Sequence, residues 1–211
     1  MTMRDRTRAG GGPRYPLALS LLIVLAAGAC TENEVPATSS PSSAASSTPT
    51  RMTADQLRRP LHFPSLQAGK TCPRDAGSKL AHAFGKATGP GPIYPVYGSR
   101  QVVGISRVNA HGRWGYVKTL WVAKQSVYDG PAIVRGHQID GPGEIRFGKG
   151  PTPDAEMLLP EDPVDQPDAP GWNEWPSYSR IQTGQYGCYA YQVDGLDFTE
   201  TVVFEVGPER F

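Results

Sequence analysis

The stretch TGQYGCYAYQVDGLDFTETVVFEV, residues 183–206, decides the fold. Its two runs, residues 187–193 and 198–206, are rich in Val, Tyr, Phe and Thr, and the turn former Asp194-Gly195 separates them. Side chains alternate between the two faces of a strand, so the second run divides into one set predicted to face mostly the core and a second set on the other face. The first set is Phe198, Glu200, Val202, Phe204 and Val206, and the second is Thr199, Thr201, Val203 and Glu205. The sequence therefore predicts a β-hairpin at the end of the chain.

The residues before this hairpin contain further strand-like runs. They are residues 101–108, 114–123, 132–139, 144–147 and 177–182, with Gly, Pro, Asn and Asp between them. A helical period is sustained only over residues 78–86, where Leu80, Ala83 and Phe84 share one side. Many short strands with regular turn signals predict an all-β sandwich or barrel, here with one short helix near the N-terminus of the domain.

Tyr186 lies two residues before Cys188 and follows a turn containing Gly184. This arrangement resembles the tyrosine corner of immunoglobulin-like sandwiches, and the likeness covers about the last thirty residues. In antibody domains the partner cysteine lies on a strand, whereas Cys72 stands in the loop-like segment GKTCPRD. We therefore expect an immunoglobulin-like β-sandwich with a different disulfide path.

The first 29 residues have the layout of a secretory signal. Four arginines, Arg4, Arg6, Arg8 and Arg14, precede the uncharged apolar run of residues 17–29. A helix of that length covers about 20 Å, which is less than the roughly 30 Å core of a bilayer. The run ends in LAAGAC, which resembles the lipobox of bacterial lipoproteins, except that Ala27 stands where that family prefers Leu. The resemblance implies cleavage before Cys30 and acylation of its sulfur. An ordinary signal cut after Ala29 is the alternative.

A tether connects Cys30 to the folded domain. Twelve of the fifteen residues in PATSSPSSAASSTPT, residues 36–50, are Ser, Thr or Pro, a composition that cannot bury a core. We assign residues 30–55 to the lipidated cysteine and this tether, and residues 56–211 to one domain. A coil of this length reaches about 25 to 30 Å. A bare spacer and an O-glycosylated stalk are both compatible with the composition.

Cysteine number and charge narrow the function classes. Without Cys30, the exported chain has Cys72 and Cys188, which predicts a disulfide. A metal pair or a reactive thiol is the alternative. Removal of the signal leaves 17 basic and 19 acidic side chains. This balance argues against nucleic acid as a partner, because phosphate binding needs a clustered basic face.

No common catalytic or nucleotide-binding motif is found in the chain. The histidines His62, His82, His111 and His137 are widely spaced, and only His137 has an acid nearby, Asp140. Residues three apart on a strand face opposite ways, so we expect His137 to be an exposed turn residue. The loop at 159–175 carries oxygen ligands of the kind that calcium prefers, but without a fixed spacing, so we expect a solvated acidic loop, with a calcium site as the alternative. These ligands are Glu161, Asp162, Asp165, Asp168 and Glu174.

Trp172 and Trp175 are the candidate ligand contacts, because aromatic rings in a loop form platforms for sugars or protein partners. Packing at the edge of the core is the alternative role for them. Trp121, within an apolar run, is expected in the core. A hydrolase would need two acids about 5 to 10 Å apart in a cleft. The candidates are Asp194, Asp197, Glu174 and Glu200.

The span from Cys72 through GPIYP, GWNEWPSYSR and GCYAYQVDG is similar to a group of secreted lipoproteins of high-GC bacteria, which implies localisation and no activity. We therefore predict a non-enzymatic protein without a cofactor, lipid-anchored on the extracytoplasmic face of the cell membrane. Its domain would have a binding or structural role toward an envelope protein or a glycan. A carbohydrate-binding module and an envelope hydrolase are the alternatives.

Overall fold

A computed structural model describes residues 52–67, 69–75, 77–80, 84–97, 102–111, 113–164 and 167–208. The predicted signal, Cys30 and nearly all of the predicted tether lie outside these residues. Within the described part of the chain, no helix is long and apolar enough to cross a bilayer. The elements are α1 (Ala54–Leu57), β1 (Ser78–Lys79), β2 (Lys86–Ala87), β3 (Ile93–Val96), β4 (Val102–His111), β5 (Trp114–Lys124), β6 (Ala132–Gln138), β7 (Ile145–Phe147), β8 (Glu156–Leu159), β9 (Trp172–Gln182), β10 (Gly187–Asp194) and β11 (Thr199–Pro208).

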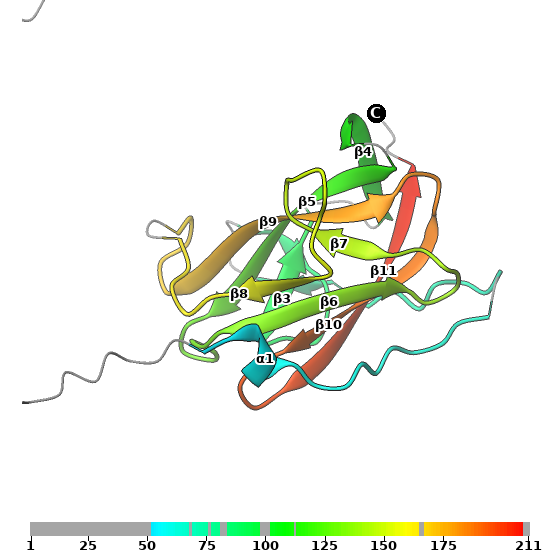
Figure 1. The fold of residues 1–211 in the computed structure, drawn as a ribbon. Helices are drawn as coiled ribbons and strands as arrows, with labels where there is room; N and C mark the ends of the chain where they lie inside the picture. The colour runs from blue at the N-terminus through cyan, green and yellow to red at the C-terminus, as the bar shows by residue number, and fades with distance from the viewer. Residues whose placement is uncertain are drawn as a thin grey trace, which may run out of the picture. The chain divides into compact units, whose positions relative to one another are not determined.

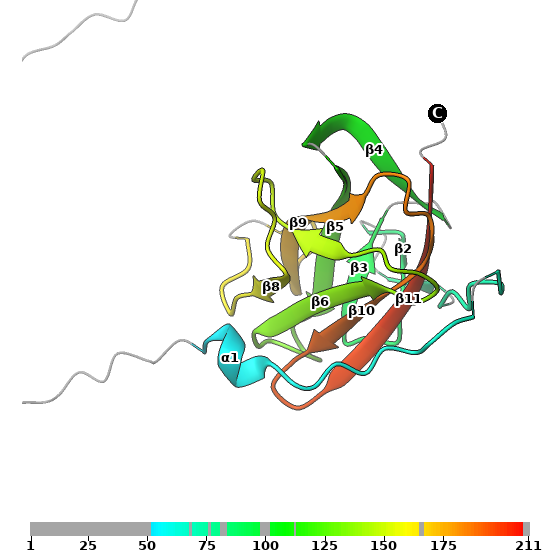
Figure 2. The same ribbon diagram turned by 45° about the vertical axis from the view of Figure 1, so that its right-hand side comes forward.

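Nine of these described strands form one continuous sheet. Its order is β7-β9-β5-β4-β11-β10-β6-β8, and β3 pairs with β5 beside this path. All pairs are antiparallel except β4 with β11, which joins the two halves of the sheet. The sheet curls into a half-barrel, so that β7, β9 and β5 face β6 and β10 (Figures 1 and 2). The predicted all-β class is therefore confirmed.

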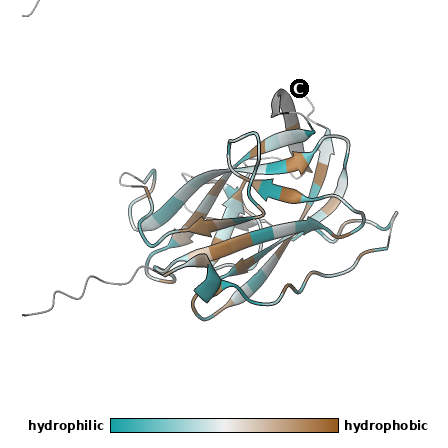
Figure 3. Cartoon of the chain, viewed as in Figure 1, coloured by the Kyte–Doolittle hydropathy of each residue, from teal (hydrophilic) through white to brown (hydrophobic). Residues whose placement is uncertain are grey.

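The main core fills the inside of the half-barrel. The ring of Tyr191 on β10 packs at 5.1 Å edge-to-face against Trp121 on β5 and at 4.6 Å against Phe204 on β11. Apolar strand residues contribute most of this core, and the loops are mostly polar or neutral (Figure 3). Burial of these large rings contributes much of the stability of such a fold, because each removes a large apolar area from water.

The C-terminal hairpin forms as predicted. β10 and β11 pair without interruption from Gly187 opposite Val206 to Asp194 opposite Thr199. Val202, Phe204 and Val206 lie in the main core, whereas Val203 packs on the other face of the sheet. The face assignment made from alternation is therefore confirmed for these residues.

The helix predicted over residues 78–86 is wrong where the structure describes it. Its two ends, β1 and β2, are short antiparallel strands, and Gly85 before β2 has φ +70°, in the left-handed region. Residues 81–83 lie outside the described part. The apolar residues that suggested a helix, Leu80 and Phe84, cover the outer face of β3 and β5 instead. Thr53 and Gln56 form a capping box for α1, which spans the predicted boundary between tether and domain.

Two other features differ from the expectation. β3, β8 and the first half of β9 lie in segments that were not predicted as strands. The immunoglobulin-like sandwich is not confirmed. Such a sandwich has two separate sheets packed together, whereas nine of the described strands form one curled sheet. Tyr186, the expected corner residue, has a side chain 36% exposed. The buried tyrosine that donates its hydroxyl proton to a nearby upstream carbonyl is Tyr189, at 2.8 Å from the Gln185 oxygen.

Candidate functional site

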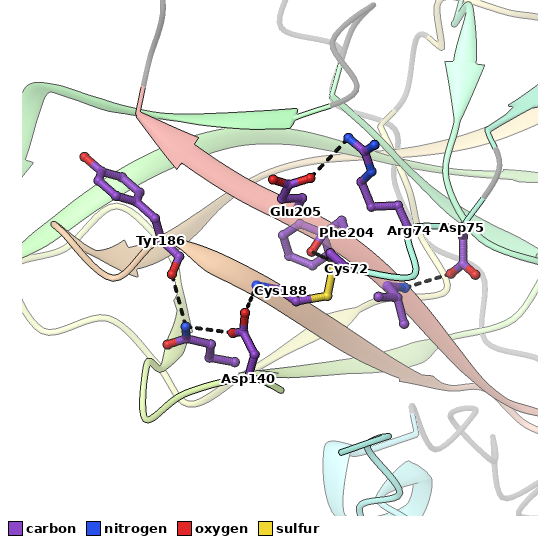
Figure 4. Close-up of a disulfide and its surroundings, with 10 residues drawn as sticks. Cys72, Arg74, Asp75, Asp140, Tyr186, Cys188, Phe204 and Glu205 are labelled. Carbon is purple, nitrogen blue, oxygen red and sulfur yellow. Dashed lines mark hydrogen bonds and ion pairs between the residues drawn. A yellow bond between two sulfur atoms is a disulfide. The ribbon is translucent and has the colours of Figure 1, made fainter. Parts of the chain in front are cut away.

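Residues 58–67 and 69–75, which we call the N-terminal strap, cover the outer face of β6, β10 and β11. The strap is bonded to β10 by the disulfide Cys72–Cys188, whose Cα atoms are 5.3 Å apart (Figure 4). Phe63 and Leu66 pack with the disulfide against Ala190 and Val203. The amide of Val203 donates to Asp75 at 2.7 Å. The predicted disulfide is present, and it closes one outer face of the half-barrel.

Asp194 lies on this covered face and is fully buried. Its carboxylate forms an ion pair with Arg135, and it accepts hydrogen bonds from Gln192 and Thr199 at 2.9 Å each. The Arg135 guanidinium also donates to the backbone oxygen of Arg59 in the strap. Asp194 is thus a saturated hydrogen-bond acceptor that holds the strap and sheet together.

The other predicted acids do not meet in one cleft. Asp197 is exposed in the turn between β10 and β11. Glu200 stands opposite Val193, whereas Asp194 stands opposite Thr199, so Glu200 and Asp194 face opposite sides of the sheet. Partial burial raises the pKa of Glu200. Glu174 lies on β9, in the other half of the half-barrel. The carboxylate pair expected of a hydrolase is therefore not formed by these four residues.

His137 and Asp140 are not paired either. Asp140 accepts hydrogen bonds from the Cys188 amide at 3.0 Å and from the Gln138 side chain at 2.9 Å (Figure 4). The His137 side chain is exposed, and its ring lies 6.2 Å from that of Phe63. His62 is exposed on the strap. His82 lies outside the described residues, and of His111 only the backbone is described.

Trp172 and Trp175 lie three residues apart on β9 and therefore point to opposite faces. Trp175 belongs to the main core, and its indole donates to the Pro160 oxygen at 2.9 Å. Trp172 is partly buried on the outer face, edge-on to Phe84 at 5.2 Å. The two rings do not form a common platform, and their placement matches the packing role that was the alternative.

The sheet is incomplete between β8 and the first half of β9. β7 pairs with β9 only from Ser179 to Ile181, and β8 pairs only with β6. Hydrogen bonds from the loop at 160–170 cross this gap: the Val164 amide donates to the Glu174 oxygen at 3.2 Å. The Ala169 amide donates to Glu174 Oε1 at 3.1 Å. The described parts of the loop, residues 160–164 and 167–170, are thus bonded to β9 at Glu174.

Two adjoining hollows remain beneath and beside this loop, with volumes of about 310 and 580 Å³. Glu174, Val164 and Pro176 line both, and we call the pair the seam groove. Apolar side chains from β3, β5, β8 and the loop form most of its walls. Its charged lining residues are Lys118, Asp162, Asp168 and Glu174. Three carboxylates and one ammonium make the groove negative, and it combines an apolar body with few polar groups, as ligand sites do.

Glu174 is the buried charged group of the seam groove, with only 3% of its surface exposed. One carboxylate oxygen accepts the Ala169 amide, and the other, Oε2, has no hydrogen bond or ion pair among the described residues. Glu174 lines both hollows, so its side chain borders the groove.

The acidic loop contains no metal site among the described residues, since no three potential ligands converge. Asp165 lies outside them. The sequence indicates Glu174 as an acid of this loop and as a candidate for a carboxylate pair. It does not indicate the lining residues Val96, Leu120 and Lys118, which only the pairing of β3, β5 and β9 brings beside Glu174. No family model, no curated protein and no solved structure matches the chain.

Proposed function

We propose that the protein is a lipid-anchored lipoprotein of the cell envelope, whose half-barrel binds a ligand in the seam groove. One observation carries the proposal: in the sequence, the lipobox-like Cys30 and its tether are followed by α1 and then by a strap that a disulfide bonds to the sheet. A disulfide is typical of exported proteins. Two or more acyl chains on Cys30 would provide stable anchoring, since each buried methylene contributes about 0.8 kcal/mol.

The geometry suits a tethered binding domain. A pull on the tether would first reach α1 and then Arg58 and Arg59. Arg58 pairs with Glu156, and Arg59 donates to the backbone oxygens of Gly195 and Phe198 at 2.7 Å. These contacts and the disulfide would carry the load on the strap face. Glu174 and the lining of the larger hollow belong to β3, β5, β9 and the loop beside them, in the other half of the sheet, so these ligand contacts lie away from the strap.

We favour binding over catalysis because the described part of the seam groove holds its carboxylates without a histidine, cysteine or serine nucleophile poised beside them. Ser177, which lines the smaller hollow, donates to the Thr119 oxygen at 3.2 Å and accepts from Trp121 at 3.1 Å. Its hydroxyl is therefore committed to the sheet. A binding role needs only the shape and charge that the groove has.

The anchoring is tested by Cys30→Ser in producing cells, with detergent phase partition and intact-mass measurement. The wild-type protein is expected in the detergent phase with the mass of added acyl chains. Cys30→Ser should lose both properties. Cys72→Ser is the matched control: it removes the other N-terminal cysteine and should keep the acyl mass. If Cys30→Ser stays in the detergent phase, the anchoring proposal is wrong.

A further inference from the structure

We propose that the seam groove binds the protonated amine of an aliphatic ligand, with Glu174 Oε2 as its counter-ion. This inference names the ligand class for the binding role proposed above and rests on that role. It identifies the ligand by its chemistry: a primary ammonium on a stem of several methylenes, as in a lysine side chain or a related diamino acid.

The charge of Glu174 favours a cationic ligand. An ionised carboxylate that is removed from water needs a cation or several donors to offset the lost hydration. Only 3% of the surface of Glu174 is exposed. Among the described residues, however, a single backbone amide, that of Ala169, donates a hydrogen bond to its carboxylate. By contrast, four acids on the described surface each form an ion pair with an arginine: Asp55, Glu144, Glu156 and Glu205. An incoming ammonium at Oε2 would supply the missing charge.

The shape of the walls beside Glu174 favours an aliphatic stem. Val122 stands opposite Glu174 in the register of β5 and β9, and Leu120 stands opposite Pro176. Leu120, Val164 and Pro176 line the larger hollow together with Val96. Aliphatic walls leading to a buried carboxylate match a side chain that buries its methylenes and carries its charge at the end.

The charge around the groove also favours a cationic ligand. Asp168 and Asp162 add negative charge at its rim. Lys118 stands opposite Tyr178 in the register of β5 and β9. Tyr178 is four residues from Glu174, so the backbone positions lie about 13 Å apart along the strand. Lys118 forms no ion pair with Glu174. A neutral sugar fits less well, because Trp175 is buried and a hydroxyl does not compensate a buried charge.

The test uses the full chain in detergent micelles with backbone amide NMR. The probe is lysine with both its α-amine and its carboxyl group capped, and the control ligand is the same molecule acetylated on its side-chain amine. We expect the probe to shift the amides of Val164 and Ala169, which bond to Glu174, in a saturable way. The acetylated control should bind at least about tenfold more weakly, since it lacks the charge-assisted hydrogen bond.

Two variants examine the site. Glu174→Gln should weaken probe binding about tenfold or more, and Glu200→Gln, the same chemical change on β11, should not alter it. Val164→Lys, at an exposed position, should also weaken binding because its ammonium would compete for Oε2. This variant keeps Glu174 and guards against a folding defect in Glu174→Gln.

Three results would overturn the inference. The first is equal binding of the charged and acetylated probes, and the second is a set of chemical-shift changes confined to residues away from β9. The third is a Glu174→Gln variant that loses binding of a neutral oligosaccharide but keeps binding of the amine. The last result would instead support a glycan site. None of them depends on acylation. Failure of the anchoring test would therefore leave the groove result standing, and the reverse also holds.

Discussion

The outer faces of the two halves of the half-barrel each bury one carboxylate, and they surround it differently. Asp194, beneath the N-terminal strap, has a guanidinium, an amide side chain and a hydroxyl as donors. Glu174, beneath the loop at 160–170, has one backbone amide. The first face is closed by a disulfide, whereas the second retains two hollows.

This difference separates structural groups from groups available to a ligand. A buried carboxylate with a full set of donors stabilises the arrangement around it, and removing one donor exposes the whole desolvation cost. A buried carboxylate with few donors lowers stability unless something binds to it. Such local conflicts are expected at functional sites. Measurements of stability and ligand binding therefore test whether Asp194 and Glu174 belong to these two classes.

Arg135→Met should have the largest effect, because it leaves Asp194 buried without its cation. We expect the free energy of unfolding to fall by about 3 to 5 kcal/mol. Arg146→Met is the control: Arg146 pairs with Glu144 at 3.1 Å, and both side chains are partly exposed, so its loss should be below about 1 kcal/mol. Urea unfolding measures both. Equal effects would show that Asp194 is not the closely compensated acid described here.

Burial also disfavours the charged form of Tyr191, which lies inside the half-barrel. Burial raises its pKa to about 12, and hydrogen bonds with Ser179, Tyr97 and Thr119 lower it only in part. Because the pKa of Tyr191 is higher in the folded state than its unfolded value of about 10, the neutral hydroxyl contributes fully to the free energy of unfolding below pH 10. This contribution is lost as the pH rises to about 12. The loss is on the order of 3 kcal/mol, because each unit of pKa difference corresponds to about 1.4 kcal/mol.

Unfolding of the wild type and Tyr191→Phe between pH 8 and 12 measures this contribution. Tyr191→Phe should show a shallower loss of stability above pH 10. Burial also raises the pKa of Tyr97, Tyr128 and Tyr189, so part of the alkaline loss should remain in the variant. Parallel curves would contradict a raised pKa of Tyr191.

Glu174→Gln and Asp194→Asn form the direct comparison. The neutral amide at position 174 keeps an oxygen for the Ala169 amide and loses the desolvated charge, so stability should stay equal or rise by up to about 1 kcal/mol. The same change at position 194 places a neutral group beside Arg135 and should lower stability by about 2 kcal/mol or more. Thermal unfolding at pH 7 decides. If both variants lose stability equally, Glu174 has structural partners like those of Asp194.

The covered face could be predicted from the sequence much better than the seam groove. The alternation of residues 198–206 is local, and once Cys30 is set aside as the predicted lipidation site, the two remaining cysteines allow only one pairing. The first half of β9 contains Pro176, and the Pro- and Gly-rich segment before it has the composition of a loop. Its strand structure depends on pairing with β5, where Trp121 stands opposite Trp175. Propensity does not reveal such a tertiary pairing.

The helix predicted over residues 78–86 is wrong for the same reason, because tertiary packing decides the structure of this segment. Leu80 and Phe84 have a helical spacing, but they are used to cover β3 and β5 from a short hairpin. Glu174 could be listed as an acid, yet its burial depends on where this hairpin and the loop at 160–170 fold. The lining of the seam groove is therefore a product of long-range packing, which the order of residues does not display.

Lys118→Gln should have the smallest effect, and its sign distinguishes two views of the seam groove. If the groove binds an amine at Glu174, removal of the exposed Lys118 ammonium, which lines the same hollow, should tighten capped-lysine binding by about twofold or less, because water and salt screen most of the repulsion. If Lys118 instead contacts an anionic part of the ligand, binding should weaken. Titration at low and at 0.5 M salt separates the two, since the tightening should vanish at high salt. Asp194 offers no such dependence, because its cation is already part of the fold.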